Sequence, residues 1–392
     1  MLKVGVGYST KANSTEAGTE AAKAALEKLG DAKPTFTIAF CTVQHDEQAV
    51  VKAINSVVGE IPLWGGTSLG GVYTPDGFIE GPDGSVGVMV ISSPDIVFGV
   101  GSTEVKGDGV NSGEIAIKKA MDAAGKKEPP SLFLMTSAIG AEEGIIRGIS
   151  SVIGSEVFPL VGGTSADNTI EGNWKQFAGK NVYSNHVVIG ALYTDLKVGF
   201  SYGHGYKPVK SGKVTKAEGR TLYEIDGRPA AEVYAEWTGK SLDSIKGGKI
   251  LSESFFAPFG VPVKNDYRIV HMINVGDDGS IACVAAINEG DEVFLMESEP
   301  NILIEETGKL FERALEIGKI TKLGFGLLVH CAGRRLALGD KIQQVIDQMK
   351  STLGEAPFIG FNTFGEQACT FDAGAMHCNL VLSAAVVGTE KK

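Results

Sequence analysis

The chain has 392 residues, with 36 basic and 47 acidic side chains and a formal net charge of −11 at pH 7. An acidic surface repels nucleic-acid phosphates and anionic lipids, so we expect no nucleic-acid partner. The apolar runs, such as Leu380–Val387, are far shorter than the ~20 residues of a membrane span. The N-terminus lacks the apolar stretch of a signal peptide. We therefore expect a cytoplasmic protein without membrane insertion.

Cysteine and histidine spacing argues against structural cross-links. The five cysteines show no C-x-x-C pair, and the six histidines show no ligand-pair motif such as H-E-x-x-H. An odd number of cysteines in a reducing compartment is typical of free thiols. We predict neither a disulfide framework nor a metal centre, and no cofactor as the first expectation.

Three segments of the chain follow one pattern, in which a helix, a buried strand and a second helix lead to a proline and a final strand. The prolines are Pro62, Pro159 and Pro357. In chain order the expected helix, strand and helix are Ser14–Leu29, Thr35–Thr42 and Glu47–Val58 in the first segment; Asn111–Ala124, Ser131–Ser137 and Glu142–Ile153 in the second; and Asn301–Ile317, Leu323–Cys331 and Leu336–Leu353 in the third.

This alternation predicts an α/β fold built from repeated strand-helix-strand-helix units with mixed sheets. The third unit is separated from the second by an insert of about 90 residues, Ser201–Gly290. We expect an N-terminal region over 1–220, holding two internal repeats at about 1–95 and 96–200. A C-terminal region would then cover 221–392.

The first two units share a Gly-Gly-Thr-Ser sequence after the proline strand. It comprises Gly65, Gly66, Thr67 and Ser68 in the first unit, and Gly162, Gly163, Thr164 and Ser165 in the second. We interpret it as a turn in which glycines bend the backbone and expose N–H groups, so these eight residues are candidate ligand contacts. A purely structural turn explains the pattern as well. Neither a Walker nor a dinucleotide-binding motif is present.

The third unit places different chemistry at the same point. Ligands of open α/β sheets bind where parallel strands end, and here the candidate residues are Cys331, Arg334, Arg335, Phe361, Asn362, Thr363 and Glu366. A guanidinium suits a ligand carboxylate, Glu366 an ammonium group and Phe361 an apolar side chain, which together fit a zwitterionic amino acid. Alternatively, Arg334 and Glu366 form a structural ion pair, and the ligand binds at the Gly-Gly-Thr-Ser segments.

Catalysis finds less support in the sequence. Cys41 and Cys331 follow buried strands, and a thiol there is more often a small core residue than a nucleophile. No Ser-His-Asp set or paired-carboxylate motif can be assigned. We therefore expect no enzyme activity, and keep a cysteine-dependent enzyme as an alternative.

The residues quoted above, together with His377-Cys378-Asn379, resemble the FIST sensory domain family, which has an N-terminal and a C-terminal FIST region. The resemblance covers about 30–220 and 221–370. It implies a small-ligand sensor in signal transduction, whose ligand is an amino acid or related small carboxylate metabolite and which reports to a separate signalling protein.

The resemblance also implies one alternative, because some relatives are haem-binding nitric oxide sensors. The candidate axial ligands in this chain would be His377, His186 and His204. The chain departs from the family pattern at Asn362, where an aromatic residue is expected, and at Cys378, where an asparagine is expected. A different ligand preference would follow from these two changes.

Overall fold

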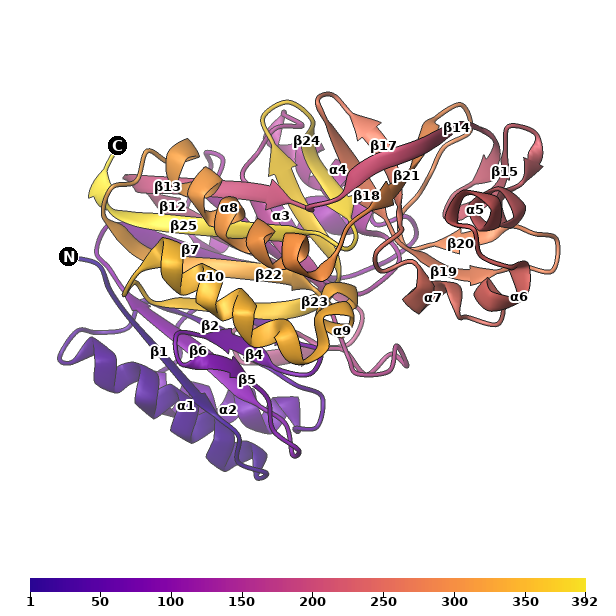
Figure 1. The fold of residues 1–392 in the computed structure, drawn as a ribbon. Helices are drawn as coiled ribbons and strands as arrows, with labels where there is room; N and C mark the ends of the chain where they lie inside the picture. The colour runs from indigo at the N-terminus through magenta and orange to yellow at the C-terminus, as the bar shows by residue number, and fades with distance from the viewer.

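The computed structural model describes residues 1–392 and contains three sheets (Figure 1). In the first unit, β6 lies between β1 and β2 and is antiparallel to both, while β2 pairs in parallel with β3. Its elements are β1 (Lys3–Ser9), α1 (Ser14–Leu29), β2 (Phe36–Cys41), α2 (Glu47–Val58), β3 (Leu63–Thr67), β4 (Val72–Thr74), β5 (Gly77–Ile79) and β6 (Val86–Ser92).

The second unit repeats this arrangement, with the strand order β9-β8-β12-β7 in place of β3-β2-β6-β1. Its elements are β7 (Ile96–Glu104), α3 (Val110–Ala123), β8 (Leu132–Ser137), α4 (Glu142–Ile153), β9 (Leu160–Ser165), β10 (Gln176–Ala178), β11 (Asn181–Tyr183) and β12 (His186–Thr194).

The third unit has the equivalent order β23-β22-β25-β13. Its elements are β13 (Leu196–Gly203), α8 (Pro300–Ile317), β22 (Leu323–Cys331), α9 (Ala332–Leu338), a 3-10 turn (Gly339–Ile342), α10 (Gln343–Leu353), β23 (Phe358–Thr370), β24 (Gly374–Cys378) and β25 (Leu382–Lys391). The single helix expected over 336–353 is wrong, because Gly339 adopts a φ of 51° between two helices.

The carbonyls of the three prolines occupy the same place in the three units. Pro62 accepts from the Thr37 N–H, Pro159 from that of Phe133, and Pro357 from that of Gly326, at 2.8–3.0 Å. Together with the shared strand order, this confirms the predicted α/β fold of repeated units with mixed sheets.

The units lock together through their hairpins. β4 of the first unit pairs with β23 of the third, β10 of the second pairs with β3 of the first, and β23 pairs with β9 of the second. The second and third units each pair a strand with the preceding unit, and the first unit pairs one with the third. The three units therefore form a closed cycle. The largest core, of 41 buried residues, draws on all three units.

The segment between β13 and α8 forms a third sheet of its own, at the opposite end of the molecule from both termini (Figure 1). Its elements are β14 (Lys207–Glu218), β15 (Thr221–Ile225), β16 (Arg228–Pro229), α5 (Ala230–Thr238), α6 (Leu242–Ile245), α7 (Ile250–Glu253), β17 (Phe259–Val263), β18 (Asp266–Val270), β19 (Met272–Val275), β20 (Ile281–Cys283) and β21 (Glu292–Glu297). We call residues 207–297 the insert. A division of the chain after residue 220 falls between β14 and β15.

No helix of the protein combines the length and the hydropathy that a membrane span requires.

Candidate functional site

The Gly-Gly-Thr-Ser segments lie in strands, so the prediction of a glycine turn is wrong at both places. Gly65 and Gly66 are inside β3, Gly162 and Gly163 are inside β9, and none has a positive φ. Glycine is needed there for close packing. A Cβ on Gly65 would lie 1.8 Å from the Ala39 carbonyl oxygen. These glycines thus admit neighbouring chain segments and do not form an open cradle.

The hydroxyls that follow these glycines are buried and mostly engaged within the protein. Thr67 Oγ1 accepts from the Lys175 N–H at 2.9 Å, and Ser68 Oγ accepts from the Asn362 N–H at 2.9 Å. Thr164 Oγ1 donates to Glu142 Oε1 at 2.9 Å. Ser165 Oγ has no partner in the protein. Of the eight segment residues, Thr164 is therefore the one tied directly to a buried charge.

That charge belongs to an ion cluster that joins the insert to the second unit. Arg220, in the turn between β14 and β15, donates to Glu142 Oε2 and to Glu143 Oε2, each at 2.6 Å. Both carboxylates stand in the first turn of α4, where the helix dipole favours negative charge. The Ala286 N–H of the insert also donates to Glu143, at 3.1 Å.

The electrostatics of this cluster favour ionised carboxylates. Burial acts to raise the pKa of Glu142 and of Glu143, but the electrostatic effects of His377 and of Arg220 outweigh it. The pKa of Glu142 is lowered, and that of Glu143 falls to about 2. The guanidinium is always charged, so the cluster persists at neutral pH.

His377 lies beside the ion cluster with one ring nitrogen free. Its Nδ1 is 3.2 Å from Gln367 Nε2, while its Nε2 is buried without a partner. Asn379 Nδ2 is also buried and unpaired, and a Cβ on Gly365 would lie 3.0 Å from His377 Nε2 and 3.2 Å from Asn379 Nδ2. Burial lowers the pKa of His377, although Glu142 and Glu143 oppose the shift. Two unsatisfied polar groups thus meet at Gly365.

Beside these groups is a pocket of about 300 Å³ between the insert, α4 and β24. Its polar lining comes from Glu143 and Arg147 of α4, Arg268 and Asn288 of the insert, and His377 of β24. Its apolar lining consists of Ile146, Ala286, Ala375 and Met376. A small cavity with an apolar wall and a few convergent polar groups is typical of a small-molecule site.

Glu366 is fully buried on β23, where it pairs with Cys378, the neighbour of His377. Its Oε1 lies 2.7 Å from Thr363 Oγ1, and its Oε2 accepts from the Val381 N–H at 3.2 Å. Burial raises the pKa of Glu366 to about 8, against the hydrogen bonds from Thr363 and Val381. The carboxyl is therefore mainly protonated at neutral pH and serves as a hydrogen-bonding group.

The structure does not bring the two predicted arginines to Glu366. Arg334 is fully buried and donates to the backbone carbonyls of Leu303, His204 and Leu380, at 2.5, 2.7 and 3.3 Å. Arg335 points elsewhere and pairs with Glu80 at 2.8 Å. Neither guanidinium forms an ion pair with Glu366, so the expected structural pair of Arg334 with Glu366 is wrong, and backbone carbonyls are the partners of Arg334.

The remaining third-unit candidates lie at the seam with the first unit. The Phe361 ring stacks on Phe40 with centroids 4.0 Å apart and an interplanar angle of 8°. Asn362 Oδ1 accepts from the Tyr73 hydroxyl at 2.8 Å, and its Nδ2 donates to the Leu69 carbonyl at 2.8 Å. Both side chains are fully buried and engaged inside the protein.

The thiols are placed as core groups. Cys41 and Cys331 are buried. Burial raises the pKa of both thiols well above the usual value, with nearby Glu47 and Glu366 adding to the effect. A nucleophilic cysteine requires the opposite shift.

The histidines considered as haem ligands lie in three different settings. His204 bonds Asp266 Oδ1 through Nε2 at 2.8 Å and accepts from the Tyr206 N–H through Nδ1 at 2.9 Å, so both nitrogens are engaged. The His186 ring stacks on Tyr183, whereas His377 borders the pocket. No three His, Cys, Asp or Glu side chains converge as a metal-ligand set.

Sequence reasoning missed Arg220, Arg268 and Gln367 as members of this region. The sequence predicted that Glu142 begins a helix after a buried strand, but nothing in the local sequence marks it as the ion-pair partner of Arg220. Arg220 and Arg268 come from the insert, whose position over α4 is set by tertiary packing. Only the general rule that sites lie at strand carboxyl ends pointed to this edge.

The chain has distant counterparts among known proteins. It is 38% identical over 104 residues to an uncharacterized protein of Methanocaldococcus jannaschii, covering 25% of this chain and about a fifth of that relative. The crystal structure of cyanuric acid hydrolase from A. caulinodans aligns over the whole of both chains with a TM-score of 0.42 and 9% identity. PurLQS from Thermotoga maritima gives 0.26 and 8%, over all of this chain and 73% of that one. Both structural likenesses are too weak to inform fold or activity.

Family membership is clear from the sequence as a whole. The FIST N domain matches residues 35–228 and the FIST C domain matches residues 230–369, which together cover nearly the entire chain. The first match contains both Gly-Gly-Thr-Ser strands and the Glu142–Arg220 pair, and the second contains the insert's Arg268 and residues 358–366 of β23. The chain therefore belongs to the FIST family of small-ligand sensory domains.

Proposed function

We propose that this protein senses an amino acid or related small carboxylate metabolite bound in the pocket between the insert, α4 and β24, and reports it to a separate signalling protein. The observation that carries this proposal is the convergence of Glu143, Arg268 and His377, from three different parts of the chain, on one small pocket. They supply an anion, a cation and a neutral hydrogen-bonding ring, which match the two charges and polar groups of such a ligand.

The binding mode follows from the charges. The Arg268 guanidinium donates one bond to the Ala286 carbonyl at 2.7 Å and keeps other N–H groups for a carboxylate. Glu143 would accept from the ligand ammonium, while Ile146 and Met376 offer the apolar wall. The His377 ring lines the β24 side of the pocket, while its unpaired Nε2 is buried against Gly365.

The signal would arise from the insert. Arg220 is shared between Glu142 and Glu143 and belongs to the insert, whereas both carboxylates belong to α4. A ligand ammonium at Glu143 competes with Arg220 for that carboxylate. Binding therefore shifts the balance of contacts that seat the insert on the second unit, and a partner that contacts the insert reads the change.

The test begins with native mass spectrometry of the purified protein, followed by thermal-shift screening of the twenty amino acids and a set of small carboxylic acids. The strongest compound is then titrated by calorimetry into wild type and Arg268→Gln. Loss of a charged partner should weaken binding by about 2–5 kcal/mol, at least tenfold in affinity.

Arg228→Gln provides the matched control, because Arg228 is an insert arginine that pairs with Glu236 at the surface, away from the pocket. Its affinity should equal that of wild type. Equal loss in both variants, or no bound compound and no thermal shift from any compound, would contradict the proposal.

A further inference from the structure

The repeated units allow equivalent positions to be compared on their first strands. In β1, β7 and β13 one glycine faces a helix so closely that a Cβ would lie within 2.1 Å of a carbonyl oxygen: Gly5 against Ala25, Gly99 against Ala120 and Gly199 against Ala314. The residues after these glycines are Val6, Val100 and Phe200. They point to the opposite face of the sheet, because side chains alternate along a strand.

These three residues differ in what covers them. Val6 is 2% exposed inside the central core, and Phe200 is 5% exposed. Phe371, in the turn of the third unit's hairpin, lies over Phe200 with ring centroids 5.2 Å apart. Val100 alone is partly exposed, and it forms the floor of a pocket of about 400 Å³. The hairpin turn of the second unit has Gly179 and Lys180, so no aromatic side chain of this turn covers Val100.

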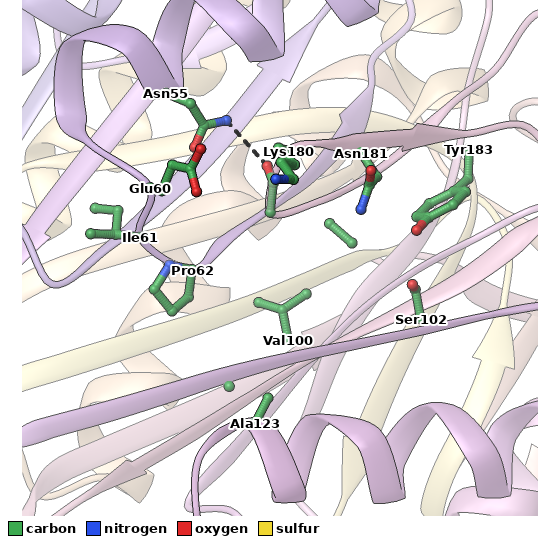
Figure 2. A pocket seen from close by; sticks show the side chains of 13 residues that line it. Asn55, Glu60, Ile61, Pro62, Val100, Ser102, Ala123, Lys180, Asn181 and Tyr183 are labelled. Atoms are coloured by element: carbon green, nitrogen blue, oxygen red, sulfur yellow. Dashed lines mark hydrogen bonds between the residues drawn. The ribbon is translucent and has the colours of Figure 1, made fainter.

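This seam pocket, between β7, the end of α2 and the β10–β11 turn, has unpaired polar groups at its rim (Figure 2). The carboxylate of Glu60 and the ammonium of Lys180 form no ion pair, although both line the pocket. Ser102, Asn181 and Tyr183 add two hydroxyls and an amide. Asn55 Nδ2 donates to the Gly179 carbonyl at 3.2 Å, which holds the turn against α2.

We propose that the seam pocket is a second ligand site, for a small zwitterion that carries one aromatic or branched apolar group. The apolar group would pack on Val100, Pro62 and Ile61, where Phe371 covers the equivalent position of the third unit. Lys180 would take the anionic group and Glu60 the cationic one. The proposal does not rest on the pocket proposed above, because the two pockets share no lining residue.

The test uses phenylalanine as the probe, with 2-phenylethylamine and 3-phenylpropionate as analogues that each lack one charge. Saturation-transfer NMR and calorimetry are run on the full chain. Phenylalanine should bind, and each analogue should bind at least tenfold more weakly. Val100→Phe fills the seam as Phe200 does in the third unit, and it should abolish binding.

Two further variants keep the test decisive if Val100→Phe folds poorly. Glu60→Gln and Lys180→Met change exposed side chains that have no partner, so both should fold, and each should weaken phenylalanine binding at least tenfold. Arg268→Gln should leave it unchanged. No binding at millimolar phenylalanine, or binding that survives both rim variants, would overturn the proposal. Binding lost in Arg268→Gln but kept in the rim variants would assign it to the other pocket and also overturn it.

Discussion

The seams between the units differ at one strand position. Gly66 and Gly163 occupy it in the first two units, and Phe361 occupies it in the third. A Cβ on Gly66 would lie 2.7 Å from Ser165 Oγ, and one on Gly163 would lie 2.2 Å from Thr363 Cγ2. Each glycine thus receives a hydroxyl-bearing side chain from the next unit.

At the third seam, between the third and first units, this position carries a large side chain of its own. The Phe361 ring stacks on Phe40 and meets Trp64 edge-on at 6.0 Å, while Ser68 binds the backbone of Asn362. The three units therefore follow the same backbone path, but different side chains fill the seams between them. A sequence motif that recurs in two units can therefore reflect the same close packing at two seams, and the side chains that differ between units show how each seam is closed.

The largest expected effect comes from breaking the aromatic seam. Phe361→Ala should lower the free energy of unfolding by about 3–5 kcal/mol, because it removes a fully buried ring and leaves a cavity beside Phe40. Urea unfolding measures the change. Phe371→Ala is the control, since that ring is 60% exposed and its loss should cost less than about 1 kcal/mol. Equal costs would show that the third seam does not depend on its ring.

The second effect is a pH dependence at Glu366, beside the seam between the second and third units. Its pKa is about 8 in the folded protein, above its ordinary value, so the folded state retains a proton that the unfolded state has lost. Stability from this group is present below the unfolded pKa and falls as pH rises towards 8.

Glu366→Gln removes that proton equilibrium and should flatten the pH profile of stability. Between pH 5 and 8 the difference in unfolding free energy between wild type and variant should change by up to about 4 kcal/mol, in favour of the variant at pH 8. Urea midpoints across this range measure it. Parallel profiles for the two proteins would show that Glu366 is ionised when buried.

A smaller effect is expected at the glycine seams. Gly163→Ala should cost about 1–3 kcal/mol, because the new methyl group overlaps Thr363. Gly66→Ala should cost less, since its nearest atom is a serine hydroxyl that can rotate away. Thermal or urea unfolding ranks the two variants. The reverse order would mean that the first two seams are not packed as described.

The smallest change in stability should come from the ion pair at the exposed edge of the seam between the third and first units. Arg335 pairs with Glu80 of the first unit and lies over the Phe78 ring at 4.9 Å. Glu80 is half exposed, and such pairs contribute less than about 1 kcal/mol. Arg335→Gln should therefore change the urea midpoint only slightly. A loss comparable to that of Phe361→Ala would place the seam's stability in its ion pair.

Much of the fold could be predicted from periodicity. Buried strands such as Ser131–Ser137 and helices such as Glu142–Ile153 carry local apolar patterns that one sequence reveals, and the recurring prolines aligned the units. The pairing of hairpin strands with a neighbouring unit could not be predicted, because β10 is three residues long and its partner β3 lies more than a hundred residues away. The sequence predicted turns where these glycines lie in strands, because turns and close approaches between backbone segments both favour glycine.

The site was less accessible to sequence reasoning. Arg334 looked like a ligand-binding arginine because charge after a strand suggests a pocket, yet three backbone carbonyls occupy it. Arg268 and Arg220 stand in ordinary strand and turn sequence, and only the seating of the insert brings them to α4. Tertiary contacts across long sequence separations leave no local pattern.

A calorimetric titration decides whether the ligand binds in the pocket between the insert, α4 and β24. The compound with the largest thermal shift is titrated into wild type, Arg268→Gln and Arg335→Gln, which remove one guanidinium from the structural pocket and one from the site expected by sequence. We expect at least a tenfold loss of affinity in Arg268→Gln and wild-type affinity in Arg335→Gln. Loss in Arg335→Gln with full binding in Arg268→Gln would contradict this expectation.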